Sequence, residues 1–98
     1  MNYQPECYTF PNRKEWRINC HLHREDGPAI EWNNGEKTWY FNGLVHREDG
    51  PAREYANGVK EWWLNGESIS EKAINDHKLK EKYPALTKSM IVHLVHNS

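Results

Sequence analysis

The chain has 98 residues, of which 37% are hydrophobic and 28% are charged, and its formal net charge at pH 7 is −1. A chain of this length forms one domain at most and buries only about 60–65% of its unfolded surface on folding. The balanced charge excludes the basic footprint of a nucleic-acid-binding domain, and no run of about 18 apolar residues is present to cross a membrane.

The first six residues, MNYQPE, contain neither the basic nor the apolar segment of a secretory signal peptide. The two cysteines, Cys7 and Cys20, have neither C-x-x-C spacing nor the cysteine and histidine pattern of a structural zinc site. We therefore expect a cytoplasmic protein without a cofactor or a structural metal.

A repeat of 23 residues dominates the chain. The heptad HREDGPA occupies residues 23–29 and again residues 46–52. Outside the heptads, the same register aligns Trp39 with Trp62. Extended backwards, it aligns Trp16 with Trp39 and defines a degraded first copy, in which Cys20 stands where a turn glycine is expected. The substitution predicts a distorted first unit.

Every glycine in the chain follows Asn or Asp, at positions 27, 35, 43, 50, 58 and 66. Such dipeptides reach positive φ at low steric cost and mark hairpin turns when strand-like segments flank them. The segments between the glycines are five or six residues long and rich in aromatic residues. Residues 1–69 are thus predicted to form an antiparallel β-meander of tandem 23-residue hairpin repeats, in a fold that is mainly β with an α C-terminus.

A two-residue turn at Asn34-Gly35 would place Ile30 opposite Trp39 and Ala29 opposite Tyr40. Because side chains alternate along a strand, the sheet would have one apolar and one polar face. The predicted apolar face holds Trp16, Ile18, Ile30, Trp32, Trp39, Phe41, Tyr55, Trp62 and Leu64. The predicted polar face holds Arg17, Ala29, Glu31, Thr38, Tyr40, Ala52, Glu54, Glu61 and Trp63. The apolar face requires a cover.

Residues 70–98 are predicted to be a helical segment that packs on one face of the sheet, within the same domain. The S-x-x-E pattern from Ser68 to Glu71 is typical of a capping box and predicts a helix from about Ser70 to about Lys82, ended by Tyr83-Pro84. Residues 85–96 fit a helix or a strand, and we favour a helix. The same segment is a candidate for pairing two copies of the chain as a homodimer.

The heptads admit a chemical and a structural interpretation. His23 with Asp26 and His46 with Asp49 could form acid/base pairs or a metal site. However, neighbouring units lie side by side in the same orientation, and Asp-Gly-Pro with a paired arginine forms a corner. We therefore predict structural corners at His23, Arg24, Asp26, His46, Arg47 and Asp49. No nucleophile elbow, P-loop, H-E-x-x-H or Rossmann fingerprint is present, so we predict no enzyme and no metal.

The tandem units between Lys14 and Gly66 resemble MORN repeats, and more closely the variant with HREDGPA and W-Y/W-x-N-G units found in bacteriophage, bacterial and large-virus proteins. The resemblance implies a sheet that serves as an interaction surface. By analogy with small phage proteins, it also implies an inhibitor of a host defence protein that acts in the host cytoplasm.

The leading functional hypothesis is a non-enzymatic protein that binds a partner protein, with no DNA and no membrane expected. Aromatic rings among charges are typical of binding hot spots. The predicted partner-binding residues are Arg17, Glu31, Tyr40, Glu54, Glu61 and Trp63, although these rings could instead only shield the sheet. One alternative is a protein that sequesters a small ligand or nucleotide by stacking. Another is a metal-dependent hydrolase that uses the heptad histidines.

Overall fold

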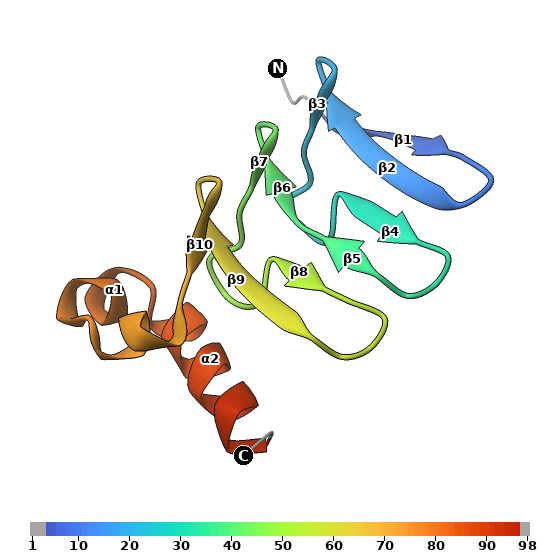
Figure 1. Ribbon diagram of the computed structural model, residues 1–98. Helices are drawn as coiled ribbons and strands as arrows, with labels where there is room; N and C mark the ends of the chain where they lie inside the picture. Colours follow the sequence, from blue (N-terminus) through green and yellow to red (C-terminus); the bar gives the residue numbers. More distant parts are fainter. Residues whose placement is uncertain (1–3, 97–98) are drawn as a thin grey trace.

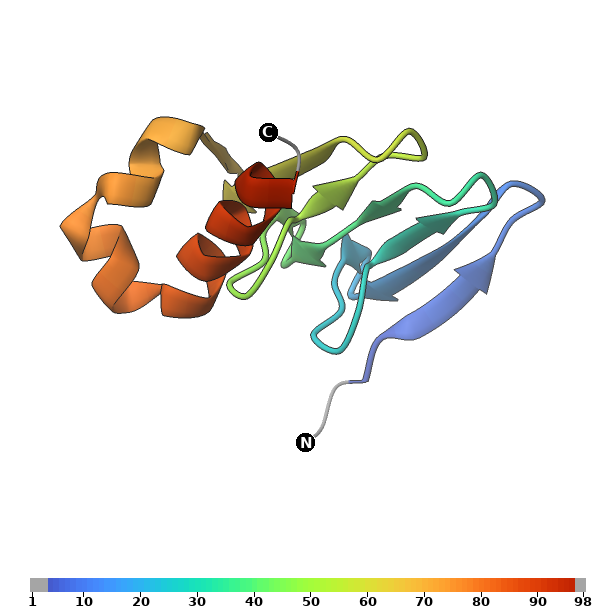
Figure 2. The same ribbon diagram turned by 90° about the horizontal axis from the view of Figure 1, so that it is seen from below.

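The structure is a computed structural model that describes residues 4–96, and the side chains of residues 4–95. It is a thin, twisted antiparallel sheet with helices packed at the end of the last repeat (Figures 1 and 2). The strands are β1 (Glu6–Thr9), β2 (Arg13–Ile18), β3 (His21–Leu22), β4 (Ile30–Trp32), β5 (Lys37–Thr38), β6 (Tyr40–Phe41), β7 (Leu44–Val45), β8 (Arg53–Glu54), β9 (Lys60–Leu64) and β10 (Glu67–Ile69). The predicted β-meander with an α C-terminus is confirmed.

The strand order repeats with the sequence. The large sheet runs β1-β2-β4-β5-β8-β9-β10, with β3 paired to β2, and β6 and β7 form a separate hairpin. Each 23-residue unit therefore adds one long hairpin to the sheet and one short hairpin beside it. Successive units lie side by side in the same orientation (Figure 1).

The short hairpins have the predicted two-residue turns. Asn42 and Gly43 have φ values of 49° and 81°, and Asn65 and Gly66 have 50° and 81°. Positive φ at both turn residues is the pattern of a type I′ turn, whose twist matches that of the flanking strands. In the first unit Cys20 has φ 68° after Asn19 at 48°, so this hairpin keeps the same turn. The expectation of a distorted first unit is wrong at this hairpin.

The long hairpins have a different turn from the predicted one. Trp32 N–H donates to Glu36 O at 2.8 Å and Gly35 N–H donates to Trp32 O at 3.0 Å, so the loop has three residues. Ile30 consequently lies opposite Thr38, one residue away from the predicted partner Trp39. The extra loop residue fits because Gly35, at φ 97°, ends the loop in the left-handed region.

Because of the one-residue shift, residues predicted to share a face on the two strands of a long hairpin lie on opposite faces of the sheet. From the strand register and the alternation of side chains, we define an open face and a capped face. The open face holds Arg13, Glu15, Arg17, Ile30, Trp32, Thr38, Tyr40, Arg53, Tyr55, Glu61 and Trp63. The capped face holds Lys14, Trp16, Ile18, Glu31, Lys37, Trp39, Phe41, Glu54, Lys60, Trp62 and Leu64. The predicted division into one apolar and one polar face is therefore wrong.

The C-terminal segment contains the 3-10 helix η1 (Glu71–Asn75), α1 (His77–Lys82) and α2 (Pro84–His96). The predicted helix from Ser70 to Lys82 is interrupted at Asp76, whose carboxylate accepts hydrogen bonds from Lys78 N–H and Leu79 N–H and begins α1. The predicted capping box is also wrong, because Ser68 lies in β10. The helical interpretation of residues 85–96 is correct.

The main core lies between the last repeat and the helices. Leu86 and Met90 of α2 and Ile74 of η1 pack on Trp62 and Leu64 of β9. Trp62 Nε1 donates to Ser89 Oγ at 3.3 Å, which satisfies the indole N–H at this contact. The helices thus cover the capped face at the third unit, and Figure 2 shows the earlier units extending beyond them.

Within residues 4–96, no helix combines the length and the apolar character needed to cross a bilayer.

Candidate functional site

The heptad histidines are acceptors inside the sheet. His23 is buried, and its Nδ1 accepts a hydrogen bond from Asn42 N–H at 2.9 Å. In the next unit His46 Nδ1 accepts from Asn65 N–H at the same distance. An accepting Nδ1 leaves the imidazole proton on Nε2, which lies toward the glutamate two residues further on, at 3.6 Å in the first heptad. Each histidine therefore supports the type I′ turn of the following unit.

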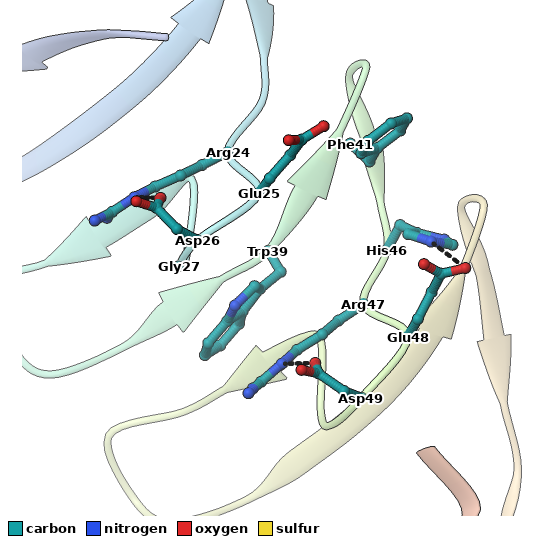
Figure 3. Close-up of a pocket in the computed structure, with 10 residues that line it drawn as sticks. All are labelled: Arg24, Glu25, Asp26, Gly27, Trp39, Phe41, His46, Arg47, Glu48 and Asp49. Carbon is teal, nitrogen blue, oxygen red and sulfur yellow. Dashed lines mark hydrogen bonds and ion pairs between the residues drawn. The ribbon is translucent and has the colours of Figure 1, made fainter. Parts of the chain in front are cut away.

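The heptad arginines cover tryptophans of the sheet, and Figure 3 draws one of the two pairs, Arg47 with Trp39. Arg47 Cζ lies 4.1 Å from the centre of the Trp39 ring, and Arg24 Cζ lies 3.9 Å from that of Trp16. Arg47 Nε also donates to Asp49 at 2.9 Å, and its Nη1 donates to the carbonyl of Pro51 at 3.1 Å. The cation–π contact and these hydrogen bonds hold the guanidinium against Trp39 on the capped face.

The remaining heptad residues make room for that arginine. A Cβ added at Gly50 would lie 2.8 Å from Arg47 Cζ, so any larger residue here would displace the guanidinium group. Ala52 is fully buried, and its carbonyl accepts a hydrogen bond from Trp39 N–H at 2.7 Å. Gly27 and Ala29 are placed in the same way in the first heptad. The two heptads therefore make the same contacts with the sheet.

A hollow of about 720 Å³ lies between the two heptads, and Trp39 and Phe41 are among the residues that line it (Figure 3). The carboxylates at its rim are largely exposed, with 86% of the Asp26 side chain and 72% of the Asp49 side chain accessible. Among residues 4–96, no group of three or more His, Cys, Asp and Glu side chains is arranged to hold a metal ion.

The structure divides the six predicted partner-binding residues between the two faces. Arg17, Tyr40, Glu61 and Trp63 lie on the open face, whereas Glu31 and Glu54 lie on the capped face. Glu31 and Glu54 lie next to heptad arginines there, at 3.5 Å from Arg24 and 3.9 Å from Arg47. The predicted site is therefore brought together only in part.

At the first unit, an ion triad around the buried carboxylate of Glu15 organises the open face. Glu15, with a side chain only 5% exposed, accepts hydrogen bonds from Arg13 Nε at 2.6 Å and from Arg17 Nη2 at 2.5 Å. Burial acts to raise the pKa of Glu15, but hydrogen bonds from Arg13 and Arg17 outweigh it, so the pKa lies below its usual value. The Arg13 guanidinium also lies 4.2 Å from the Phe10 ring centre.

At the third unit, Glu61 organises the other end of the open face. Its Oε1 accepts hydrogen bonds from the Tyr55 hydroxyl and from Trp63 Nε1, both at 3.1 Å. Burial and then the hydrogen bond to Glu61 raise the pKa of Tyr55. Arg53 Cζ lies 5.4 Å from the Tyr55 ring centre and 6.0 Å from that of Trp63. The rings are half-buried and held in place by these contacts.

The open face also contains Trp32 and Tyr55, which were predicted to lie on the apolar face beneath the helices. A signal for the correct register is present in the charges. The observed pairing places Glu31 between Lys14 and Lys37, and the same alternation continues through Glu54 to Lys60. Opposite charges directly across strands are stabilising, whereas the predicted register pairs Glu31 with a threonine.

Comparisons with protein-family models, with curated proteins and with solved structures find no match to the chain. The resemblance to MORN repeats therefore stays a prediction from the HREDGPA and W-Y/W-x-N-G motifs.

Proposed function

We propose that this chain is a non-enzymatic binding protein and that its open face binds a folded partner protein. The observation that carries the proposal is the set of half-exposed aromatic and arginine side chains on the face opposite the helices. They are Arg13, Arg17, Trp32, Tyr40, Arg53, Tyr55 and Trp63. Trp, Tyr and Arg are the residue types that contribute most to protein interfaces.

The rigidity of these side chains supports the proposal. Arg13 and Arg17 are fixed by Glu15, and Tyr55 and Trp63 are fixed by Glu61. Side chains that are ordered before binding lose less conformational entropy when the partner arrives. The heptads, by contrast, use their histidine and arginine side chains in contacts within the sheet, which favours binding over catalysis as the function.

The resemblance to repeats of phage proteins leads us to propose a host protein as the partner, with inhibition as the result. Such a partner can be identified by affinity purification from a bacterial host, followed by reconstitution of the complex from purified proteins. The role of the open face is then tested by measuring how substitutions on it change the dissociation constant of that complex.

Tyr40→Ala combined with Trp32→Ala should weaken the reconstituted complex at least about tenfold while the circular dichroism spectrum is unchanged. Leu44→Ala combined with Ile91→Ala is the matched control, because these exposed apolar residues lie outside the open face. A folded open-face variant that binds as tightly as the native protein would contradict the proposal.

A further inference from the structure

A second hollow lies on the capped face, where α2 meets the third repeat. Its volume is about 420 Å³, within the range of sites for small molecules and too small for a folded partner. Two alternate residues of β9 and one side of α2 line it. They are Lys60, Trp62, Ala85, Lys88, Ser89, Val92 and His93. The lining thus contains two lysines and no acidic residue.

Within the described part of the chain, neither ammonium group makes a hydrogen bond or an ion pair. The carboxylate nearest to Lys60 in the strand register is that of Glu54, which lies 3.9 Å from Arg47 Nη1. Two ammonium groups beside one hollow repel each other and attract an anion. The electrostatics therefore favour a ligand with a negative group.

The rest of the lining combines the Trp62 ring, Ala85 and Val92 with two polar side chains, Ser89 and His93. The Trp62 indole is 7% exposed and fixed by its hydrogen bond to Ser89 and by the His93 ring, whose centre is 5.2 Å away. Ala85 and Val92 lie on the same side of α2, seven residues apart, and add apolar surface. A ligand with a planar or apolar body would contact these groups.

The hollow exists because the repeat pattern changes at the third unit. In the first two units an arginine covers the tryptophan, but the position 23 residues after Arg47 is Ser70. The ring of Trp62 is covered by α2 instead, and the gap between helix and strand brings Lys60 and Lys88 to one place. No equivalent pair of lysines lines the hollow at Trp39.

We propose that this hollow binds a small organic anion, with its phosphate or carboxylate group at Lys60 and Lys88 and its planar body against Trp62 and Val92. The site is on the face opposite the proposed partner-binding surface, so the two functions are independent. Loss of one should leave the other intact.

The test is a titration of the full-length protein with phenyl phosphate, benzoate and neutral phenol, followed by calorimetry and by the indole N–H signals in NMR spectra. Trp62→Phe assigns the Trp62 signal. We expect saturable 1:1 binding of at least one of the two anions, at least about tenfold tighter than phenol, with a shift of the Trp62 signal. The comparison of the two anions shows whether phosphate or carboxylate is preferred.

Lys60→Glu combined with Lys88→Glu should reduce that affinity at least about tenfold. Both lysines are exposed, and circular dichroism checks that the variant is folded, because Lys60→Glu places a glutamate opposite Glu54. The matched control is Lys37→Glu, because Lys37 occupies the position of Lys60 in the preceding repeat and on the same face. The proposal is overturned if neither anion shows saturable binding. It is also overturned if the Lys60→Glu/Lys88→Glu variant binds the anion as tightly as the native protein, or if Lys37→Glu lowers the affinity by as much as that variant does.

Discussion

Gly50 lies directly against the guanidinium group of Arg47, and this contact explains why the heptad contains glycine although its backbone is not in the left-handed region. Gly50→Ala would displace Arg47 from Trp39 and remove its hydrogen bonds to Asp49 and Pro51. We expect a loss of about 1–2 kcal/mol in the free energy of unfolding, measured by urea denaturation.

A double-mutant cycle separates this effect from backbone strain. In an Arg47→Ala background, Gly50→Ala should cost almost nothing, because no guanidinium remains to be displaced. Gly58→Ala is the control: Gly58 has φ 91° and no atom near its added Cβ, so the cost should be equal in both backgrounds. Full additivity at position 50 would contradict the assigned role of the glycine.

Cys20 is a non-glycine residue in the left-handed region, at φ 68°, where the later repeats have Gly43 and Gly66. A residue with a Cβ costs about 1 kcal/mol more than glycine in this conformation. Cys20→Gly should therefore raise the free energy of unfolding by about that amount, which corresponds to about 4–8 °C in Tm. Cys20→Ala removes only the thiol, and equal stabilisation by this variant would count against a backbone effect.

The Glu15 triad predicts a dependence of stability on pH. The pKa of Glu15 is lowered from its ordinary value of 4.5, so the folded state holds this proton more weakly than the unfolded state. The stability it contributes is fully present above about pH 4.5 and is lost as the pH falls through the lower, folded-state pKa. Relative to the native protein, Glu15→Gln should be less stable at pH 7, with the difference narrowing below about pH 4.5. A constant difference from pH 7 to pH 3 in urea denaturation would refute this.

Helix α2 takes the place of a third heptad. The residues that follow β9 at the heptad positions are Ile69, Ser70 and Glu71, so no arginine is available to cover Trp62. Leu86 and Met90 of α2 supply the buried apolar surface, and His93 supplies the ring above the indole. The helix therefore ends the array of repeats and protects the last tryptophan from water.

Leu86 is fully buried at this contact, whereas Ile91 on the outer side of α2 is 42% exposed. Leu86→Ala should lower the free energy of unfolding by about 2–5 kcal/mol, and Ile91→Ala should change it by about 0.5 kcal/mol or less. Thermal unfolding followed by tryptophan fluorescence measures both. Similar effects of the two substitutions would show that α2 is not docked as described.

The molecule as a whole is a thin slab, with extents of 38 × 34 × 18 Å and a radius of gyration of 14.2 Å. A compact domain of this length has a radius of about 12.6 Å. The difference arises because each repeat contacts mainly its neighbours and only the last one is covered by helices. Such a fold is stabilised by interfaces between adjacent units, so its length is adjustable.

Insertion of a second copy of residues 44–66 between Gly66 and Glu67 should therefore add one unit to the sheet and keep the helical end intact. We expect a folded, more stable protein with a larger radius of gyration in small-angle X-ray scattering. A control insertion of the same 23 residues in scrambled order should fail to stabilise the protein. Equal behaviour of the two insertions would rule out repeat stacking as the source of stability.

The sequence by itself determined the features that depend on contacts within one repeat or between neighbouring repeats. The period of 23 residues and the hairpin turns at Asn42-Gly43 and Asn65-Gly66 follow from turn geometry and from side chains close along the chain. Of the predicted partner-binding surface, Arg17, Tyr40, Glu61 and Trp63 lie together on one face, because both the predicted and the observed register put them there.

Only the tertiary structure decided the register of the long hairpins, the interruption at Asp76 and the face that the helices cover. A single extra loop residue moves every following side chain to the other face, and the Asn-Gly turn pattern alone does not resolve that difference. The signal for the observed register lies in lysines and glutamates that meet only across neighbouring strands. The position of the helices depends on Trp62 and Leu64, which lie on the capped face of the last unit and are buried there by Ile74, Leu86 and Met90, residues further along the chain. The face that the helices cover is therefore determined by burial of apolar surface between distant segments and not by local propensity.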